Sequence, residues 1–215
     1  MENLIYRHRA SKGGLLLTSG KDELKLGTSL ITYLKTWYAE NKSGVFEDIK
    51  SKYLSKGLIC ENELIDITAS QLGLGILEKN EVKFHDEHFQ GVPDVITDEY
   101  IIDTKNSWSY ATFLDSVMSP IDKDYEAQLQ IYMHLTGVKK AKLVYGLLDV
   151  PAEANYGNEV LYSHMPIEDR FFVFDLEYSE EYIAKLIEKV NNCKLFIESY
   201  DSKVKSLSWK SKYLK

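Results

Sequence analysis

The spacing of apolar positions changes along the chain, and each change marks the boundary of a predicted element. Apolar residues recur at helical spacing in four stretches, which we expect to be helical: about 21–41 (one or two helices), 47–72 (interrupted or bent near Gly57), 122–135 and 179–197. Short runs rich in β-branched and aromatic residues predict strands: 78–84, 91–96, 100–105, 141–150 and 171–178. Segment 107–120 is predicted to be a loop with a short helical turn, and Gly13-Gly14 a turn. This order predicts an α/β fold whose mixed central sheet is flanked by helices.

The strands at 91–96 and 100–105 are expected to form a β-hairpin around a three-residue turn. Side chains at i and i+2 share one face of a strand, so Asp103 and Lys105 point the same way. Asp94 lies on the partner strand and reaches that face if the register allows it. Carboxylates at this position can hold Mg²⁺ or Mn²⁺, and a lysine can orient a water beside a phosphate. The alternative is a solvated hairpin, because acidic-x-Lys is a common pattern on exposed strands.

Length and composition restrict the classes of protein that fit. The 215 residues predict one domain over 1–215, with an N-terminal helical segment, a C-terminal helix and a basic tail. No apolar run approaches the ~20 residues of a membrane span, and the first residues lack the apolar core of a signal peptide. Cys60 and Cys193 cannot supply a four-thiolate metal site and are expected to be free thiols. We therefore expect a cytoplasmic protein without membrane contact.

The formal net charge of −7 disfavours nonspecific coating of nucleic acid but leaves room for a local basic groove. Lysines gather in the last fifteen residues: Lys203, Lys205, Lys210, Lys212 and Lys215. This tail is either a solubilising end or a DNA contact, and both interpretations stay open.

Pro93-Asp94 followed by Asp103-Thr104-Lys105 resembles the PD-(D/E)XK nuclease signature, with aspartate in the D/E place. Downstream, Gln128 and Tyr132 share a helix face at i and i+4. This helix is followed by Thr-Gly and a hydrophobic strand, and that order is similar to the RecB-like branch of the superfamily. The resemblance covers about residues 7–148. It implies a restriction-endonuclease-like core, with metal held by Asp94 and Asp103.

Upstream of the hairpin, Gly57 is followed four residues later by a helical glutamate, Glu61, which is similar to the family's first motif. The resemblance implies that Glu61 is a further carboxylate near the metal, with Glu63 as its close competitor. It also implies metal contact by the Thr104 carbonyl. Lys105 would orient the attacking water, Gln128 would position water or phosphate, and the Tyr132 hydroxyl can do likewise.

The N-terminal segment 7–11 resembles the Arg/Ser segment of lambda-type phage exonucleases. The resemblance implies that Arg9 and Ser11 contact a terminal 5′-phosphate, for which the planar guanidinium is well shaped. Trp108 and Tyr110 can stack on an unpaired base near the cleft, although core packing is the competing role for at least one of them. His85 and His88 are expected to lie in a surface loop, because His-x-x-His alone does not define a zinc site.

The resemblance implies a Mg²⁺- or Mn²⁺-dependent DNA exonuclease of phage recombination type, working in the host cytoplasm if phage-encoded. Its implied partners are linear duplex ends and a single-strand annealing or recombination protein, and it allows a homo-oligomer. One rival is a structure- or sequence-dependent endonuclease on the same core. Another is a catalytically inactive nucleic-acid-binding or anti-defence adaptor. A small-molecule-binding α/β protein is disfavoured, because the chain has no phosphate-cradling glycine loop.

Overall fold

The computed structural model describes residues 4–21, 23–46 and 52–207. Its main sheet has the strand order β4-β5-β6-β7. The strands are β4 (Val95–Ile96), β5 (Tyr100–Asn106), β6 (Lys140–Gly146) and β7 (Phe171–Glu177). The β5–β6 pair is parallel, whereas β4–β5 and β6–β7 are antiparallel, so the sheet is mixed as predicted. The expected hairpin is confirmed: Val95 pairs with Ile102, and the Thr97 N–H donates to the Tyr100 carbonyl across the turn.

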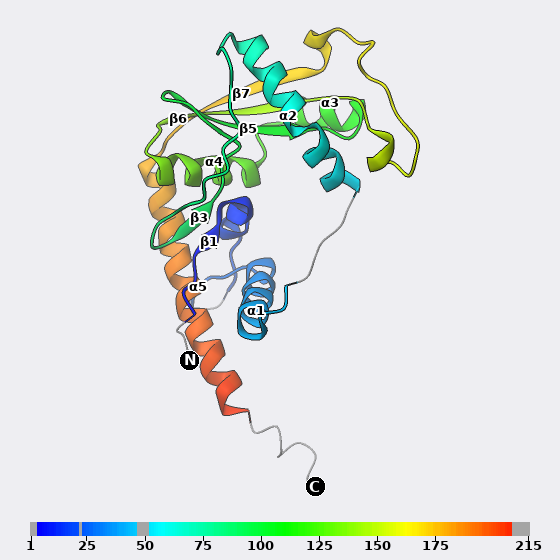
Figure 1. The fold of residues 1–215 in the computed structure, drawn as a ribbon. Coiled ribbons are helices and arrows are strands. Elements are labelled where there is room, and N and C mark those ends of the chain that lie inside the picture. The colour runs from blue at the N-terminus through cyan, green and yellow to red at the C-terminus, as the bar shows by residue number, and fades with distance from the viewer. Residues whose placement is uncertain (1–3, 22, 47–51, 208–215) are drawn as a thin grey trace.

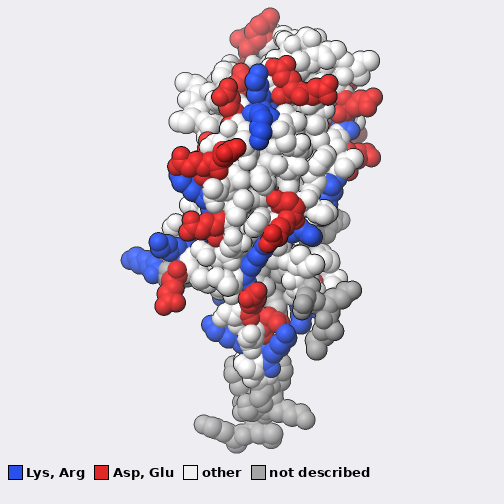
Figure 2. Space-filling model, turned by 90° about the vertical axis from the view of Figure 1, so that its left-hand side faces the viewer, with Lys and Arg blue, Asp and Glu red and all other residues white. Residues whose placement is uncertain are grey.

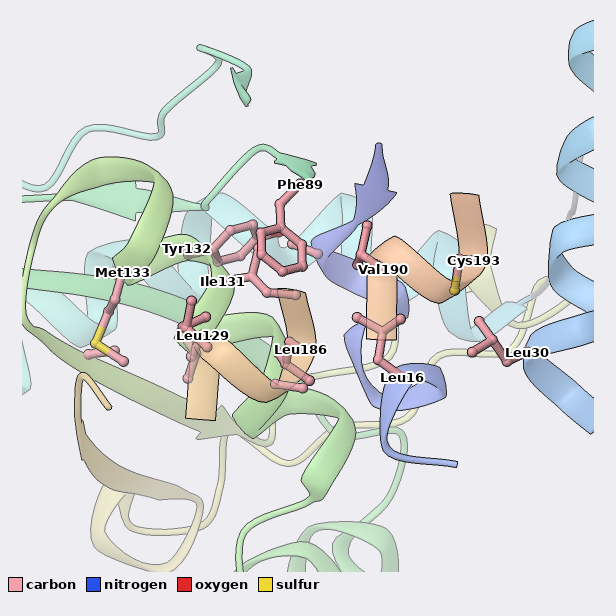
Figure 3. Close-up of a cluster of buried hydrophobic side chains, with 14 of the residues drawn as sticks. Leu16, Leu30, Phe89, Leu129, Ile131, Tyr132, Met133, Leu186, Val190 and Cys193 are labelled. Atoms are coloured by element: carbon pink, nitrogen blue, oxygen red, sulfur yellow. The ribbon is translucent and has the colours of Figure 1, made fainter. Parts of the chain in front are cut away.

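Helices cover both faces of this sheet, as Figure 1 shows. The helices are α1 (Thr28–Ser43), α2 (Lys52–Leu72), α3 (Tyr110–Met118), α4 (Lys123–Thr136) and α5 (Glu180–Ser206). On one face, Leu64 and Ile65 of α2 pack with Ile102 of β5 in an apolar cluster. On the other, α4 and α5 share a larger cluster with the N-terminal segment. Figure 3 shows side chains from α1, α4, α5 and β3 meeting there.

A second, three-stranded sheet has the order β1-β3-β2. Its strands are β1 (His8–Arg9), β2 (Phe84–His85) and β3 (Phe89–Gly91). The predicted strand 91–96 is therefore split, because Gly91 ends a strand of this sheet and Val95 begins one of the main sheet. The strand predicted at 78–84 is wrong: Lys79 forms only an isolated bridge to Val95, and β2 begins at Phe84.

Three helical predictions need correction. Segment 107–120 contains a true helix, α3, whose capping box joins Ser109 and Thr112. The helix α2 continues through Gly57 without a break, and residues 47–51 of the predicted helix lie outside the described residues. Gly13-Gly14 is no turn: it belongs to the 3₁₀ helix η1 (Ala10–Leu17), where a Cβ on Gly13 would stand 3.1 Å from the Ala127 Cβ. The small residues let η1 approach α4 closely.

The remaining elements follow the sequence pattern more closely. Asp122 caps α4 by accepting from the Asp124 N–H, and Gly137 ends the helix with φ 82°, as the Thr-Gly stop signal predicts. The long apolar run at 141–150 pairs as a strand only to Gly146. It is followed by the short 3₁₀ helices η2 (Ala152–Ala154) and η3 (Ile167–Asp169). The final helix, α5, extends beyond residue 197 to Ser206.

Across the described ranges, no helix is long and apolar enough to cross a bilayer. Acidic and basic side chains are interspersed on the face that Figure 2 shows. Lys203 and Lys205 of the predicted basic tail lie on α5, and Lys205 pairs with Asp201. The other tail lysines, from Lys210 onward, lie outside the described residues.

Candidate active site

The candidate site lies where β5 extends beyond the end of β4. The two residues of β4 pair only with Ile101 and Ile102, so β5 continues past them with one edge uncovered. Asp94 fills this edge: its Oδ2 accepts from the Thr104 N–H at 2.8 Å and the Thr104 hydroxyl at 3.2 Å. The N–H and C=O of one strand residue point to the same side, so the Thr104 carbonyl faces the same uncovered edge. The register thus brings Asp94 beside the Asp103–Thr104 peptide, as the hairpin prediction required.

Asp103 and Lys105 point to the same face and form an ion pair between the Asp103 Oδ2 and the Lys105 Nζ. The Asp103 side chain is fully buried, whereas Lys105 is partly exposed. Burial raises the pKa of the Asp103 carboxyl, the Lys105 ammonium opposes this, and nearby Asp94 adds to it. Burial alone would lower the pKa of Lys105, but the Asp103 and Asp94 carboxylates outweigh it and raise that pKa. Lys105 is therefore held as a cation.

Helix α4 contributes a row of three side chains beside this pair: Tyr125, Gln128 and Tyr132. The Gln128 Nε2 donates to the Asp103 Oδ1 at 3.0 Å and to the Tyr132 hydroxyl oxygen at 3.1 Å, so the predicted i, i+4 pair does face the carboxylate. Burial raises the pKa of Tyr132, which keeps its hydroxyl protonated. Gly91 makes room for this ring, since a Cβ there would stand 2.5 Å from the Tyr132 Cε1. At the other end of the row, the Lys105 Nζ lies 4.8 Å from the centre of the Tyr125 ring.

Glu61 comes from α2, on the opposite face of the sheet. Its Oε2 accepts from the Lys79 Nζ at 2.6 Å, and the carboxylate is close enough to contribute to the raised pKa of Asp103. Glu63 is exposed and has no comparable position. Of the two competing glutamates, the fold brings Glu61 toward the site, with its carboxylate turned to Lys79.

Within the described residues, no three His, Cys, Asp or Glu side chains form a ready-made metal cluster. Mg²⁺ does not need one, because it keeps several waters and is commonly held by one or two carboxylates together with substrate phosphates. Asp94 and Asp103 supply two such carboxylates beside the Thr104 carbonyl. The buried Asp103 Oδ2 is paired with the Lys105 Nζ. These hard oxygen donors fit Mg²⁺ or Mn²⁺, whereas the buried, free thiols of Cys60 and Cys193 lie elsewhere.

Two cavities flank the row on α4. One, of about 430 Å³, is lined by Arg9, Ser11, Lys83 and Tyr132, among others. We call it the arginine cavity. The other, of about 460 Å³, is lined by Lys105 and a group of aromatic side chains: Tyr53, Trp108, Tyr125 and Tyr145. We call it the aromatic cavity.

Tyr125 and Tyr132 belong to opposite cavities and are seven residues apart on α4. This separation is about 10 Å at the helical rise per residue. The candidate site lies between the two cavities. The fold thus brings the predicted phosphate-contact residues Arg9 and Ser11 to one end of the row, and Trp108 to the other.

Some of the other predicted residues do not line either cavity. Tyr110 stacks on Phe113 and does not line the aromatic cavity. His85 is exposed but belongs to β2, so the loop prediction is wrong for this residue, whereas His88 lies between β2 and β3 and its carbonyl accepts from the His8 N–H.

Sequence reasoning missed Lys56, whose side chain is 1% exposed. Its Nζ donates to the Ser107 carbonyl at 2.6 Å and the Leu148 carbonyl at 2.8 Å, and so ties α2 to the segments that follow β5 and β6. Burial lowers the pKa of Lys56 to about 8, although Cys60 and Asp149 act in the opposite direction. Only the packing reveals this role, because a single lysine on an amphipathic helix is usually solvated.

A mixed sheet with helices on both faces and an acidic-x-Lys strand at its open edge is the restriction-endonuclease-like α/β architecture. The chain matches no known family model and no curated protein sequence. Among solved structures, it is similar to the phage-related exonuclease from Haemophilus somnus 129PT (TM-score 0.82, 21% identity), covering 94% of this chain and 97% of that one.

It is also similar to the alkaline exonuclease LHK-Exo from Laribacter hongkongensis (TM-score 0.71, 16% identity), covering 93% of this chain and 91% of that one. The structure of LHK-Exo in complex with dAMP gives the same TM-score at 17% identity, with the same coverage. At these identities the likeness establishes a shared fold.

Proposed function

We propose that this protein is a divalent-metal-dependent DNA exonuclease that hydrolyses phosphodiester bonds. The observation that carries the proposal is the Asp103–Lys105 pair, with Asp103 fully buried and hydrogen-bonded by Gln128 at the open edge of β5. Taking a carboxylate and an ammonium out of water is costly, and a well-packed apolar pair would often serve stability equally well. Such groups beside a cavity are typical of catalytic sites. The exonuclease names of the structural neighbours support the same class.

In this proposal Asp94 and Asp103 hold Mg²⁺ or Mn²⁺ together with the Thr104 carbonyl. Glu61 joins them directly or through a water when its carboxylate turns away from Lys79. A bound ion of this kind polarises the phosphate and lowers the pKa of a coordinated water. Gln128 keeps the Asp103 carboxylate in place through its Oδ1, while the Oδ2 would exchange its pairing with the Lys105 Nζ for the ion.

Lys105 has two tasks in the proposed reaction. Its ammonium orients the attacking water, and it stabilises the negative charge that builds on the phosphate oxygens in the transition state. The carboxylates that raise its pKa keep this charge in place. Tyr132 donates its hydroxyl hydrogen to water or phosphate, since its oxygen already accepts from Gln128. In-line attack then breaks one P–O bond of the backbone.

The arginine cavity is the reason for proposing an exonuclease rather than an endonuclease. An enzyme that works from an end must recognise that end, and a terminal phosphate distinguishes it from the interior of a strand. Arg9, Ser11 and Lys83 line this cavity next to Tyr132, so a terminal 5′-phosphate bound there would lie beside the reacting centre. LHK-Exo has been solved with the mononucleotide dAMP, the kind of product an exonuclease releases.

The proposal is tested with end-labelled linear duplex beside closed circular duplex, each with Mg²⁺, Mn²⁺ or EDTA. We expect metal-dependent loss of the linear DNA alone, with the label position giving the polarity. Cleavage of the circle would replace the exonuclease with an endonuclease on the same core. No cleavage of either DNA, with binding retained, would favour the inactive adaptor.

A further inference from the structure

The aromatic cavity opens next to Lys105, yet none of the metal-holding or phosphate-holding roles above requires it. Its volume of about 460 Å³ is comparable with that of the arginine cavity on the other side of the site. The lining is of a different kind. Aromatic rings dominate one part of it, and hydroxyl and carboxylate groups of α3, including Thr112, Asp115 and Ser116, line another.

This lining suits a base rather than a phosphate. Asp115 would repel a phosphate, whereas a carboxylate and hydroxyls can accept hydrogen bonds from base amino groups. Stacking of bases on aromatic side chains tolerates any sequence, because every base has a π-face. Lys105 is the cation among the lining residues, and it stands on the side of the cavity that faces Asp103. A nucleotide with its base in the cavity therefore keeps its phosphate at the reacting centre.

The mouth of the cavity carries a cluster from two distant parts of the chain. Tyr53 of α2 and Trp108, which follows β5, meet edge to face with ring centres 5.1 Å apart. The Lys52 Nζ lies 4.6 Å from the centre of the Trp108 ring and 5.3 Å from that of the Tyr53 ring. Tyr53 nevertheless leaves 60% of its surface exposed, so this aromatic pair is not part of the apolar core. Exposed aromatic rings beside a lysine are the usual composition of a surface that binds single-stranded nucleic acid.

We propose that the aromatic cavity is a subsite for one unpaired nucleotide of the substrate strand, on the far side of the scissile phosphate from the arginine cavity. The inference rests on the proposed nuclease function and assigns a place to the second nucleotide from the end. The separation of about 10 Å between Tyr125 and Tyr132 leaves the scissile phosphate above Gln128 and Asp103. A base that enters this cavity has left its duplex stack, so the subsite selects strand ends that are frayed or single-stranded.

The test is equilibrium binding of 5′-phosphorylated single-stranded oligonucleotides in EDTA, where the proposed chemistry cannot run. An abasic residue replaces one base at a time from the first to the fifth position. For the wild type we expect about a tenfold loss of affinity at the second position and little at the others. Trp108→Ala is expected to bind the intact strand about tenfold more weakly and to lose nothing further when the second base is removed.

Three further variants control for indirect effects. Trp108→Phe keeps a ring and is expected to retain most of the position effect. Tyr53→Ala removes a largely exposed side chain and is expected to weaken the effect without loss of folding. Tyr156→Ala, at an 88% exposed tyrosine outside the cavity lining, should behave as the wild type. A position effect that is unchanged in both Trp108→Ala and Tyr53→Ala would overturn the subsite.

Three further outcomes separate related possibilities. Free dAMP carries the same chemistry as a nucleotide of the strand. With dAMP at the same concentration as the oligonucleotide, the proposal predicts that the position effect survives, because the second nucleotide is tethered to the bound strand. Loss of the effect at that concentration would assign the cavity to the released product. If the position effect is present but no metal restores cleavage, the nuclease proposal fails while the subsite stands. Cleavage without any position effect would contradict the subsite and leave the nuclease proposal intact.

Discussion

At the scale of single residues, the site depends on charges whose environments are controlled by packing. Asp103 is kept from water by β5 and α4, and its negative charge is balanced by Lys105 rather than by solvent. Asp94 is held by two hydrogen bonds from Thr104. A carboxylate pair fixed in this way needs little reorganisation to bind a cation, which favours catalysis over simple structural pairing.

Lys56 gives a residue-scale prediction about stability and pH. Its pKa is lowered by burial to about 8, below the usual 10.5 that it regains in the unfolded chain. Between these two values the unfolded chain binds more protons than the folded protein, so the free energy of unfolding rises with pH as the folded group loses its charge. The neutral amine keeps two N–H donors, which is enough for the Ser107 and Leu148 carbonyls.

The measurement is urea unfolding of the wild type and Lys56→Met at pH 7, 8, 9 and 10. We expect the stability difference, wild type minus variant, to increase over this range. Lys83→Met, at an exposed lysine, should show no such trend. Parallel curves for wild type and Lys56→Met would contradict the account of Lys56.

At the scale of elements, the site is assembled where short segments meet longer ones. The two residues of β4 stop early and expose the edge of β5, and β3 ends at Gly91 against α4. Helix α4 can approach this junction because glycines face it, Gly13 from η1 and Gly91 from β3. The position of Tyr132, and through it of Gln128, follows from that close approach.

A pair of glycine substitutions tests this. In Gly91→Ala, the new methyl group would meet Tyr132 and Ala10, whose Cβ would be 2.9 Å away, so we expect a loss of about 1–3 kcal/mol of stability and slower DNA cleavage. Gly57→Ala is the matched control, because a Cβ there has open space in the middle of α2. It should gain up to about 1 kcal/mol. Denaturant unfolding measures both changes, and a neutral Gly91→Ala would contradict the close-packing account.

The sequence pattern was sufficient where the signal is local. The hairpin, the C-terminal end of α4 and the strand at β7 follow from alternation, turn residues and stop signals. It failed where distant packing decides the outcome. Gly13-Gly14 has the composition of a turn, yet contact with α4 makes it part of η1.

The candidate site likewise contains residues that the sequence predicted and residues that only the packing reveals. Asp94, Asp103, Lys105 and Gln128 were predicted from the hairpin pattern together with the resemblance to the nuclease signature, and the fold brings them together. The burial of Lys56 could not be found from sequence, because it depends on carbonyls 51 and 92 residues away. The meeting of Tyr53 with Trp108 also joins elements far apart in the chain.

At the scale of the whole molecule, the chain is acidic, and three of its cations line the two cavities beside the candidate site. The chain carries a net charge of −7, and Figure 2 shows both signs interspersed over one face. By contrast, Arg9 and Lys83 line the arginine cavity, and Lys105 lines the aromatic cavity. This distribution favours a protein that binds a short stretch of strand at its end over one that coats DNA through its general charge.

The most direct test of the account is the cleavage rate of end-labelled linear duplex with Mg²⁺, for the wild type and for Lys105→Ala. Loss of one preorganised charge that stabilises the transition state typically costs about 10²–10³-fold in rate, and we predict a decrease of that size. Lys140→Ala, at an exposed lysine of β6 paired with Glu99, is the matched control and should cleave at the wild-type rate. Both variants are first shown to be folded by circular dichroism. Full metal-dependent cleavage by a folded Lys105→Ala would show that the chemistry lies elsewhere on the molecule.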